Sequence, residues 1–403
     1  MKRYRILSIA YLTVCAIIIG ILTGFYLNTI NYVIELIWQD IPRWLHIPSQ
    51  WKAVALCLPF GLLIGLVQKY IGAYPLTIAQ ILNKVRIRGY FPYQNWKKIL
   101  FAGLLILGAG GSIGPEASAS GLVAGMVYWF GCRYKLIVDQ SADYASQSLP
   151  RQLSAIINTR TQEHHYKNKI GEYFANDQRK KLFYWVWTLV GLVGFFGYFH
   201  FFPQEGVIGF HHPVIHWQWQ GLLVVIPALI IGWLFGYFFV KVSRLCEHWL
   251  SDPNWTILKA IAGGVLLIAG SYFSRDILFS GEFSIVPFAH HSLTMSPVYL
   301  ILLAVIKTVV TNAGFALGWR GGTIFPAIFS SLAIGAALAQ ALPWMPRLTA
   351  CVVVATSITV ILENPLISAI ILILLLPIQF SIFIILVCYL TSYLTKHYQF
   401  LRP

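Results

Sequence analysis

Gly108-Ala-Gly-Gly-Ser-Ile-Gly-Pro-Glu-Ala-Ser-Ala-Ser120 interrupts an apolar chain between residues 99–107 and 121–130. Neither flanking segment reaches the roughly 20 apolar residues that a membrane-spanning helix needs. The interruption carries four glycines, a proline and the carboxylate of Glu116. Irregular backbone at membrane depth is tolerated only where it is buried in protein or lines a polar cavity. Two explanations fit: an ion site at the ends of half-helices, or a re-entrant packing kink whose glutamate is held structurally.

The composition places the chain in a membrane. Hydrophobic residues make up 58% of the sequence and charged residues only 11%, against about 25% charged in soluble proteins. The net charge of +15 comes from basic residues in loops between apolar runs, which is typical of cytoplasmic loops and not of a nucleic-acid-binding protein. The apolar run 6–30 is long enough to span, and no signal-peptide cleavage motif follows it. We therefore expect a multi-pass protein of the cell membrane with a retained first helix and a cytoplasmic N-terminus, in contact with the lipid bilayer. No metal-ligand or cofactor motif is apparent.

At the interruption the sequence resembles the CLC family of chloride channels and chloride/proton exchangers. The second signature of that family is G-x-E-G-P, which Gly114 and Glu116 match, while Ala117 and Ser118 replace its last two residues. The resemblance implies that Glu116 is the gate, because the family's carboxylate occupies the anion pathway when ionised and leaves it when protonated. It also implies that Gly114, Pro115, Glu116 and Ala117 bind the anion, that chloride is the default ion, and that the chain forms a homodimer.

A second Gly-rich interruption, Asn312-Ala-Gly-Phe-Ala-Leu-Gly-Trp-Arg-Gly-Gly-Thr-Ile-Phe-Pro326, lies in the other half of the chain. It resembles the family's third signature, G-x-F-x-P, through Gly322 and Pro326. The anion-binding residues that this resemblance implies are Gly322, Thr323, Ile324 and Phe325. Each interruption follows a short apolar run and precedes a small-residue segment, and paired interruptions of this kind are the best sequence indication of an internal repeat around a central site.

These patterns predict an all-α, polytopic membrane protein of broken and re-entrant helices, arranged in two inverted-topology halves as in the CLC family. We divide the chain into first-half membrane helices at 1–132, a polar cytoplasmic insert at 133–181 and the remaining membrane helices at 182–403. The insert is polar and mixed in charge, and we expect surface helix over much of it.

The chain departs from the family at three places. Its first signature, G-S-G-I-P, is matched only by Gly72 and Pro75, without the serine that coordinates the anion in the family. The inner glutamate that passes protons to the gate has no counterpart in residues 133–181. The tyrosine that closes the anion site from inside is assigned by position alone to Tyr398.

Several functions stay open at this point. The resemblance permits a channel, a chloride/proton exchanger or a fluoride transporter, and the altered signatures permit a non-transporting partner subunit. A polytopic membrane enzyme would have Glu116 and Glu363 as its acids, but no hydrolase, zinc-protease or nucleotide-binding motif accompanies them. Glu363 precedes Pro365 at an expected helix end, where a capping role is as plausible as a transport role. We expect Glu282 to be exposed in a loop.

Overall fold

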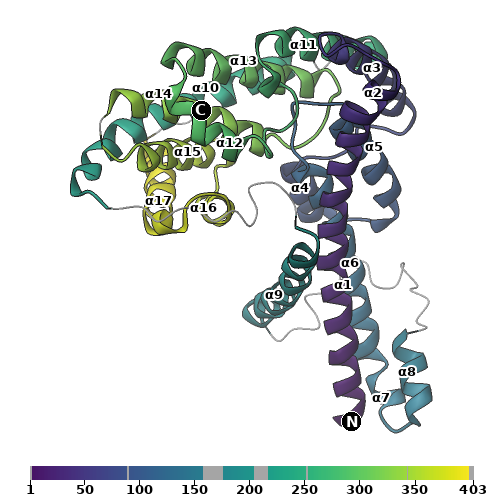
Figure 1. The fold of residues 1–403 in the computed structure, drawn as a ribbon. Helices are drawn as coiled ribbons and strands as arrows, with labels where there is room; N and C mark the ends of the chain where they lie inside the picture. Colours follow the sequence, from purple (N-terminus) through teal and green to yellow (C-terminus); the bar gives the residue numbers. More distant parts are fainter. Residues whose placement is uncertain are drawn as a thin grey trace. The chain divides into compact units, whose positions relative to one another are not determined.

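The computed structural model describes residues 2–88, 90–157, 176–203, 217–250, 253–342 and 344–398. Within these residues the secondary structure is helical, and the β-type pairing consists of one isolated bridge (Figure 1). The chain forms two compact units. The first contains Met1–Val33, Pro75–Gly103 and Glu116–Gln204, and the second contains Ile34–Tyr74, Leu104–Pro115 and Glu205–Pro403.

Eight helical stretches of the described residues are long and apolar enough to cross a membrane. They are Lys2–Trp44, Lys52–Tyr70, Gln178–Phe201, Trp219–Leu250, Thr256–Phe273, Pro297–Ala316, Ile324–Ala341 and Ile378–His397. The prediction of an all-α polytopic membrane protein is confirmed.

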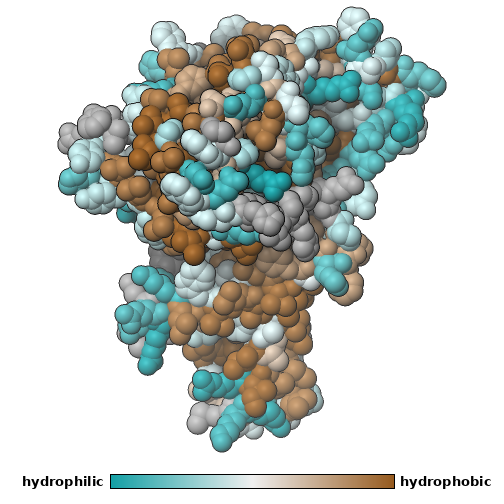
Figure 2. Space-filling view, turned by 60° about the vertical axis from the view of Figure 1, so that its left-hand side comes forward, coloured by the Kyte–Doolittle hydropathy of each residue, from teal (hydrophilic) through white to brown (hydrophobic). Residues whose placement is uncertain are grey.

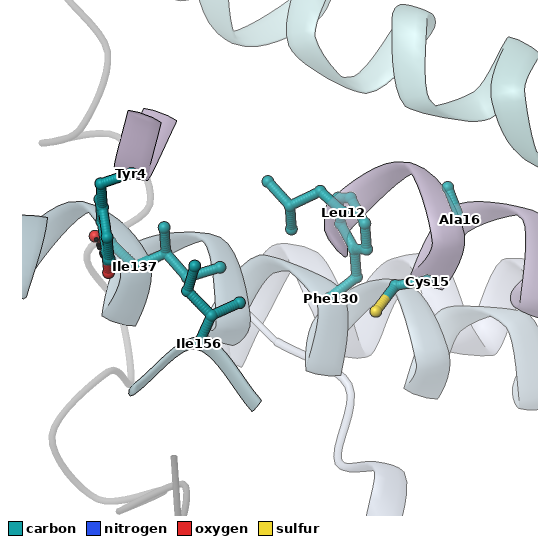
Figure 3. Packing of buried hydrophobic residues seen from close by; sticks show 7 residues of the cluster. All are labelled: Tyr4, Leu12, Cys15, Ala16, Phe130, Ile137 and Ile156. Atoms are coloured by element: carbon teal, nitrogen blue, oxygen red, sulfur yellow. Dashed lines mark hydrogen bonds between the residues drawn. The ribbon is translucent and has the colours of Figure 1, made fainter. Parts of the chain in front are cut away.

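The first unit is built on long helices that pack side by side. Its helices are α1 (Lys2–Glu35), α4 (Ile78–Arg88), the start of α5 (Trp96–Gly108), α6 (Glu116–Asp139), α7 (Ser141–Tyr144), α8 (Leu149–Ile157) and α9 (Asp177–Phe201). A buried apolar cluster joins three of them (Figure 3): Tyr4, Leu12, Cys15 and Ala16 from α1, Phe130 and Ile137 from α6, and Ile156 from α8. The hydroxyl of Tyr4 also donates to the carbonyl oxygen of Ile137 at 3.3 Å.

Small residues bring α1 and α9 together. A Cβ atom on Gly20 would lie 1.9 Å from the carbonyl oxygen of Gly191, and one on Gly194 would lie 2.2 Å from the carbonyl oxygen of Ile17. Gly20 and Gly24 have the four-residue spacing that lets two membrane helices approach closely. The glycines therefore fix the contact between these helices by leaving room for backbone.

The second unit holds most of the predicted second half. Its helices are the end of α5, α2 (Ile41–Trp44), α3 (Lys52–Tyr70), α10 (Val225–Leu250), α11 (Thr256–Phe273), α12 (Ile285–His291), α13 (Pro297–Ala316), α14 (Ile324–Ala341), α15 (Pro346–Leu362), α16 (Pro365–Leu375) and α17 (Ser381–His397). Close packing again uses glycine. Gly232 of α10 lies against α15, where Ser357 Oγ donates to the Gly232 carbonyl oxygen at 2.8 Å.

Helix α6 is longer than its apolar run suggests. The sequence predicts an apolar segment ending near Phe130, whereas the helix continues to Asp139, and α7 and α8 follow it. Surface helix was expected within the polar insert 133–181, part of which lies outside the described residues, and its assignment as a separate cytoplasmic segment stays a prediction.

The outward faces of several helices are apolar. Only 6% of the most apolar window of Gln178–Phe201 is buried, and exposed side chains on α9 include Leu182, Trp185, Val186, Leu189, Leu192, Val193 and Phe196. Figure 2 shows hydrophobic residues spread over large areas of the face in view. Apolar surface of this extent marks contact with lipid or with another protein rather than with water.

Candidate functional site

The part of the first interruption up to Pro115 meets the second interruption within the second unit. The N–H of Gly114 donates to the carbonyl oxygen of Gly322 at 2.7 Å, and the N–H of Gly322 donates back to the Gly114 carbonyl oxygen at 3.0 Å. The two residues thus form an isolated antiparallel bridge, and both are buried. The structure brings together one predicted site residue from each half of the chain.

The first interruption turns its carbonyl groups into the surrounding protein. Gly110 has φ +86°, a conformation that glycine adopts at no steric cost. The Gly108 carbonyl oxygen accepts a hydrogen bond from the Trp38 indole at 2.9 Å, and the Gly110 carbonyl oxygen accepts one from the Phe279 N–H at 3.1 Å. A Cβ atom at position 110 would lie 2.4 Å from the Trp38 ring. The glycines here are therefore required both by the turn and by the closely packed tryptophan.

A hydroxyl pair ties the first interruption to the helix that precedes the second one. Ser112 Oγ and Thr311 Oγ1 lie 2.9 Å apart, and both side chains are almost completely buried. Because Thr311 belongs to α13, this contact supplements the glycine bridge with a side-chain link.

The second interruption is anchored by Trp319. Its side chain is 1% exposed, and its indole N–H donates to the carbonyl oxygen of Ala260 at 2.7 Å. The ring occupies a notch on α11, where a Cβ atom at Gly263 would approach it to 2.5 Å. Gly318, with φ +103°, makes the turn that directs Trp319 into this notch. The loop before α14 is thus held by a large buried side chain.

The two interruptions also touch through Ile113 and Gly321. A Cβ atom on Gly321 would lie 2.0 Å from Cδ1 of Ile113, whose side chain is 1% exposed. Position 321 therefore has no room for a side chain while the interruptions keep this separation.

Helix α14 begins directly after the bridge. Thr323 occupies its N-cap position without a side-chain capping bond, Ile324 is buried and Phe325 is half-buried. The first-turn N–H groups of an α-helix point out of its N-terminal end and carry about half an elementary positive charge. Such an end attracts anions through backbone groups, whatever the side chains are.

Glu116 is the first residue of α6. The residue is half-buried, its Oε2 atom is buried, and the following Ala117 is completely buried. A carboxylate in the first turn of a helix is stabilised by the helix dipole. In the sequence, this acidic residue follows the bridging Gly114 by two positions.

Two charged residues near the interruptions were missed in the sequence analysis. Lys307 of α13 is fully buried, and Arg320 stands immediately before Gly321. The signal was present, since an ionisable residue within or beside an apolar run is by default a functional candidate in a membrane protein.

The remaining predicted residues have different surroundings. Tyr398 is the C-cap residue of α17 and is 45% exposed, and the centre of its ring lies 5.1 Å from that of the His397 ring. Its assigned role stays a prediction. Glu363 is exposed and forms the C-cap of α15 with φ +54°. The expectation for Glu282 is wrong. Its side chain is only 7% exposed, because the preceding Gly281 packs tightly on the ring of Phe329 and draws the loop inward.

Within the described residues, no group of three or more His, Cys, Asp and Glu side chains is placed to hold a metal ion. The serines Ser112 and Ser118 are buried. The arrangement at the interruptions therefore offers backbone dipoles and one carboxylate rather than a metal centre.

Comparison with known proteins gives a consistent result. The sequence model of the family described as voltage gated chloride channel matches residues 178–397, which is more than half of the chain and includes the second interruption. Among curated proteins, no sequence matches the chain significantly.

Solved structures extend the likeness over almost the whole chain. A CLC-type fluoride/proton antiporter matches with a TM-score of 0.66 and 15% identity, covering 97% of this chain and 96% of the other. A slow cyanobacterial Cl⁻/H⁺ antiporter matches with a TM-score of 0.67 and 18% identity, covering 95% and 93%. A eukaryotic CLC transporter matches with a TM-score of 0.66 and 12% identity, covering 96% and 72%. At these identities the likeness establishes the fold.

Proposed function

Because this chain belongs to the voltage-gated chloride channel family, we propose that it carries a small anion, chloride by default, across the cell membrane at the two paired interruptions. The observation that carries this proposal is the backbone bridge between Gly114 and Gly322. Members of this family are channels and transporters rather than enzymes. We extend the same function to this chain.

The anion is held by backbone N–H groups near the bridge. An ion that enters a pore loses hydration, and a full opposite charge would trap it, so partial charges give binding that is strong enough for entry and weak enough for release. The N–H groups assigned to the ion are those of Glu116 and Ala117 in the first interruption and of Thr323, Ile324 and Phe325 in the second. Gly114 and Gly322 frame the site instead, because their N–H groups are donated to the bridge, and Pro115 has no N–H. The hydrogen bonds that the Trp38 indole and the Phe279 N–H donate to the carbonyl oxygens of Gly108 and Gly110 support this assignment, because they keep acceptor oxygens of the first interruption occupied.

Glu116 is the gate in this proposal. The helix dipole that attracts chloride also attracts the Glu116 carboxylate, so the ion and the side chain compete for one place. Protonation removes the negative charge of Glu116 and ends the competition. Anion flux should therefore rise as the pH falls.

A flux assay on the purified protein in liposomes tests both statements. Chloride efflux should be measured for the wild type and for Glu116→Gln over a range of pH, with Glu363→Gln as the matched control at an exposed helix end. We expect Glu116→Gln to be fast and independent of pH, whereas Glu363→Gln keeps the wild-type response. If Glu116→Gln kept the wild-type pH response, Glu116 would not be the gate. No anion flux by the folded wild type would contradict the function itself and favour a partner subunit.

Proton coupling and ion identity need a second measurement. Two similar structures are those of proton-coupled antiporters, one for chloride and one for fluoride, but the chain has no counterpart of the inner glutamate in residues 133–181. We therefore propose an uncoupled pathway. Under a pH gradient at equal chloride concentrations, the reversal potential should stay at zero. A shift with the pH gradient would establish exchange, and a larger flux of fluoride than of chloride would identify a fluoride transporter.

A further inference from the structure

Arg320 is a charged side chain next to the paired glycines. Its backbone N–H donates to the Gly318 carbonyl oxygen at 2.9 Å, so the residue lies in the turn that leads to Gly321 and Gly322. Its guanidinium carbon lies 5.1 Å from the centre of the Phe315 ring. This ring supplies a cation–π contact.

The charge of Arg320 is poorly compensated by the protein. Its Nε atom is buried and makes no hydrogen bond, and no carboxylate in the described part of the chain lies within 4.0 Å of the guanidinium. The carboxylate of Glu247, near the end of α10, acts on it from a greater distance. The Glu247 side chain is exposed, so solvent weakens this attraction.

Lys307 shows what a structural cation looks like in the same unit. Its ammonium group donates to backbone carbonyl oxygens of Asp276, Ile277 and Phe279. That saturation accounts for the buried lysine without any ligand. Arg320 is half-buried and has no comparable set of acceptors, and its Nε atom is buried without one, which is costly for a charged group.

We propose that Arg320 determines anion affinity by adding a fixed positive charge to the second interruption, an inference that rests on the proposed anion transport. Its Cα is two positions from that of Gly322, with Gly321 between them, which limits their distance to about 7 Å. A unit charge at about 7–10 Å from an anion, at an effective dielectric constant near 20, changes binding by roughly 15- to 55-fold. The helix end and the bridge orient the ion, and Arg320 sets how tightly it is held.

The test compares two variants, one without the positive charge and one without the negative charge, whose effects on chloride affinity should be opposite in sign. Chloride binding to the purified protein should be measured by calorimetric titration, and chloride flux in liposomes as a function of concentration. We expect Arg320→Gln to weaken chloride binding by roughly 15- to 55-fold, and Arg320→Lys to weaken it less. Glu247→Gln removes the opposing carboxylate, so it should strengthen binding by a smaller factor. Lys241→Gln, which removes an exposed positive charge from the same helix as Glu247, should change nothing.

The outcomes separate this inference from the proposed function. If the wild type carries chloride and both Arg320→Gln and Glu247→Gln bind it as the wild type does, Arg320 has no role in affinity and the transport function stands. If Arg320→Gln fails to fold, Arg320→Lys and Glu247→Gln decide by the same criterion. A merely structural arginine would not give affinity changes of opposite sign at positions 320 and 247. A wild type that neither binds nor carries chloride overturns both.

Discussion

Lys307 of α13 is a positive charge inside the apolar core of the second unit. The side chain has no exposed surface, and its ammonium group lies 2.5 Å from the Asp276 carbonyl oxygen and 3.1 Å from that of Phe279. It also lies 5.0 Å from the centre of the Phe329 ring on α14. Since Phe279 donates to Gly110, the lysine is linked to the first interruption through the Phe279 backbone, and to α14 through the Phe329 ring.

Replacing this lysine by an apolar residue of similar length should destabilise the protein. Lys307→Met leaves buried carbonyl groups without donors, which costs about 1–3 kcal/mol for each unsatisfied group, although loss of the buried charge offsets part of it. We expect a lower midpoint of thermal unfolding in detergent, with Lys241→Met as the control at an exposed position. Equal midpoints for the two variants would show that the carbonyl groups find other donors.

At the scale of helices and loops, the sequence predicted the interruptions but not their supports. Runs of glycine with proline between apolar segments are local signals, and both interruptions were located from them. The burial of Glu282 and the length of α6 were not predicted, because they depend on contacts with residues far away in the sequence. The Tyr4 to Ile137 hydrogen bond is one such contact of α6. The hydrogen bond between Trp38 and Gly108 is another long-range contact that no local sequence pattern predicts.

The contact between Gly321 and Ile113 predicts a rescue experiment. Gly321→Ala places a Cβ atom 2.0 Å from Ile113 Cδ1, so it should separate the interruptions and abolish most chloride flux. Ile113→Ala in the same chain removes the nearest obstructing atoms and should restore part of the flux, a non-additive result that indicates direct contact. Gly314→Ala is the control, since a Cβ atom there meets nothing within 4 Å. Additive losses in the double variant would contradict the contact.

The packing of α1 on α9 gives a second prediction at this scale. A side chain on Gly20 would enter the backbone of α9 at Gly191, and overpacking of this kind costs about 1–3 kcal/mol. Gly20→Ala should therefore lower thermal stability, while Gly197→Ala on α9 should not, because position 197 has open space around it. The comparison is made by unfolding midpoints in one detergent. Equal stability of the two variants would mean that the helices separate without cost.

For the whole molecule, composition was sufficient to predict the environment, and the order of apolar runs predicted most of the spans. Neither the predicted homodimer nor the predicted orientation in the membrane can be derived from the fold of a single chain. The homodimer implied by the family would cover an apolar face such as that of α9, but lipid covers such a face equally well. Orientation rests on the basic loops, whose excess of lysine and arginine favours the cytoplasmic side.

Labelling at the two ends of α3 tests this orientation. Cys246 is the one cysteine of the six that is not buried. The Cys246→Ser variant should therefore react little with a maleimide and can serve as the background for added cysteines. On it, Gln50→Cys before α3 should react with a membrane-impermeant maleimide added to intact cells. Arg86→Cys in the basic segment after α3 should react only in inverted vesicles. The opposite pattern would place the N-terminus outside.

The single bridge between Gly114 and Gly322 limits how the pathway can open. Pro115 has no N–H to extend the pairing, so in the described residues the backbone link is an isolated rung of two hydrogen bonds. Pulling the two loops apart would break both bonds at once in a setting without water to replace them. Widening by helix separation is thus disfavoured, and the aperture keeps a constant backbone width. Under the proposed function, the swing of a side chain then decides whether an ion is admitted, and we expect the conductive and closed states to be nearly identical in their main-chain geometry.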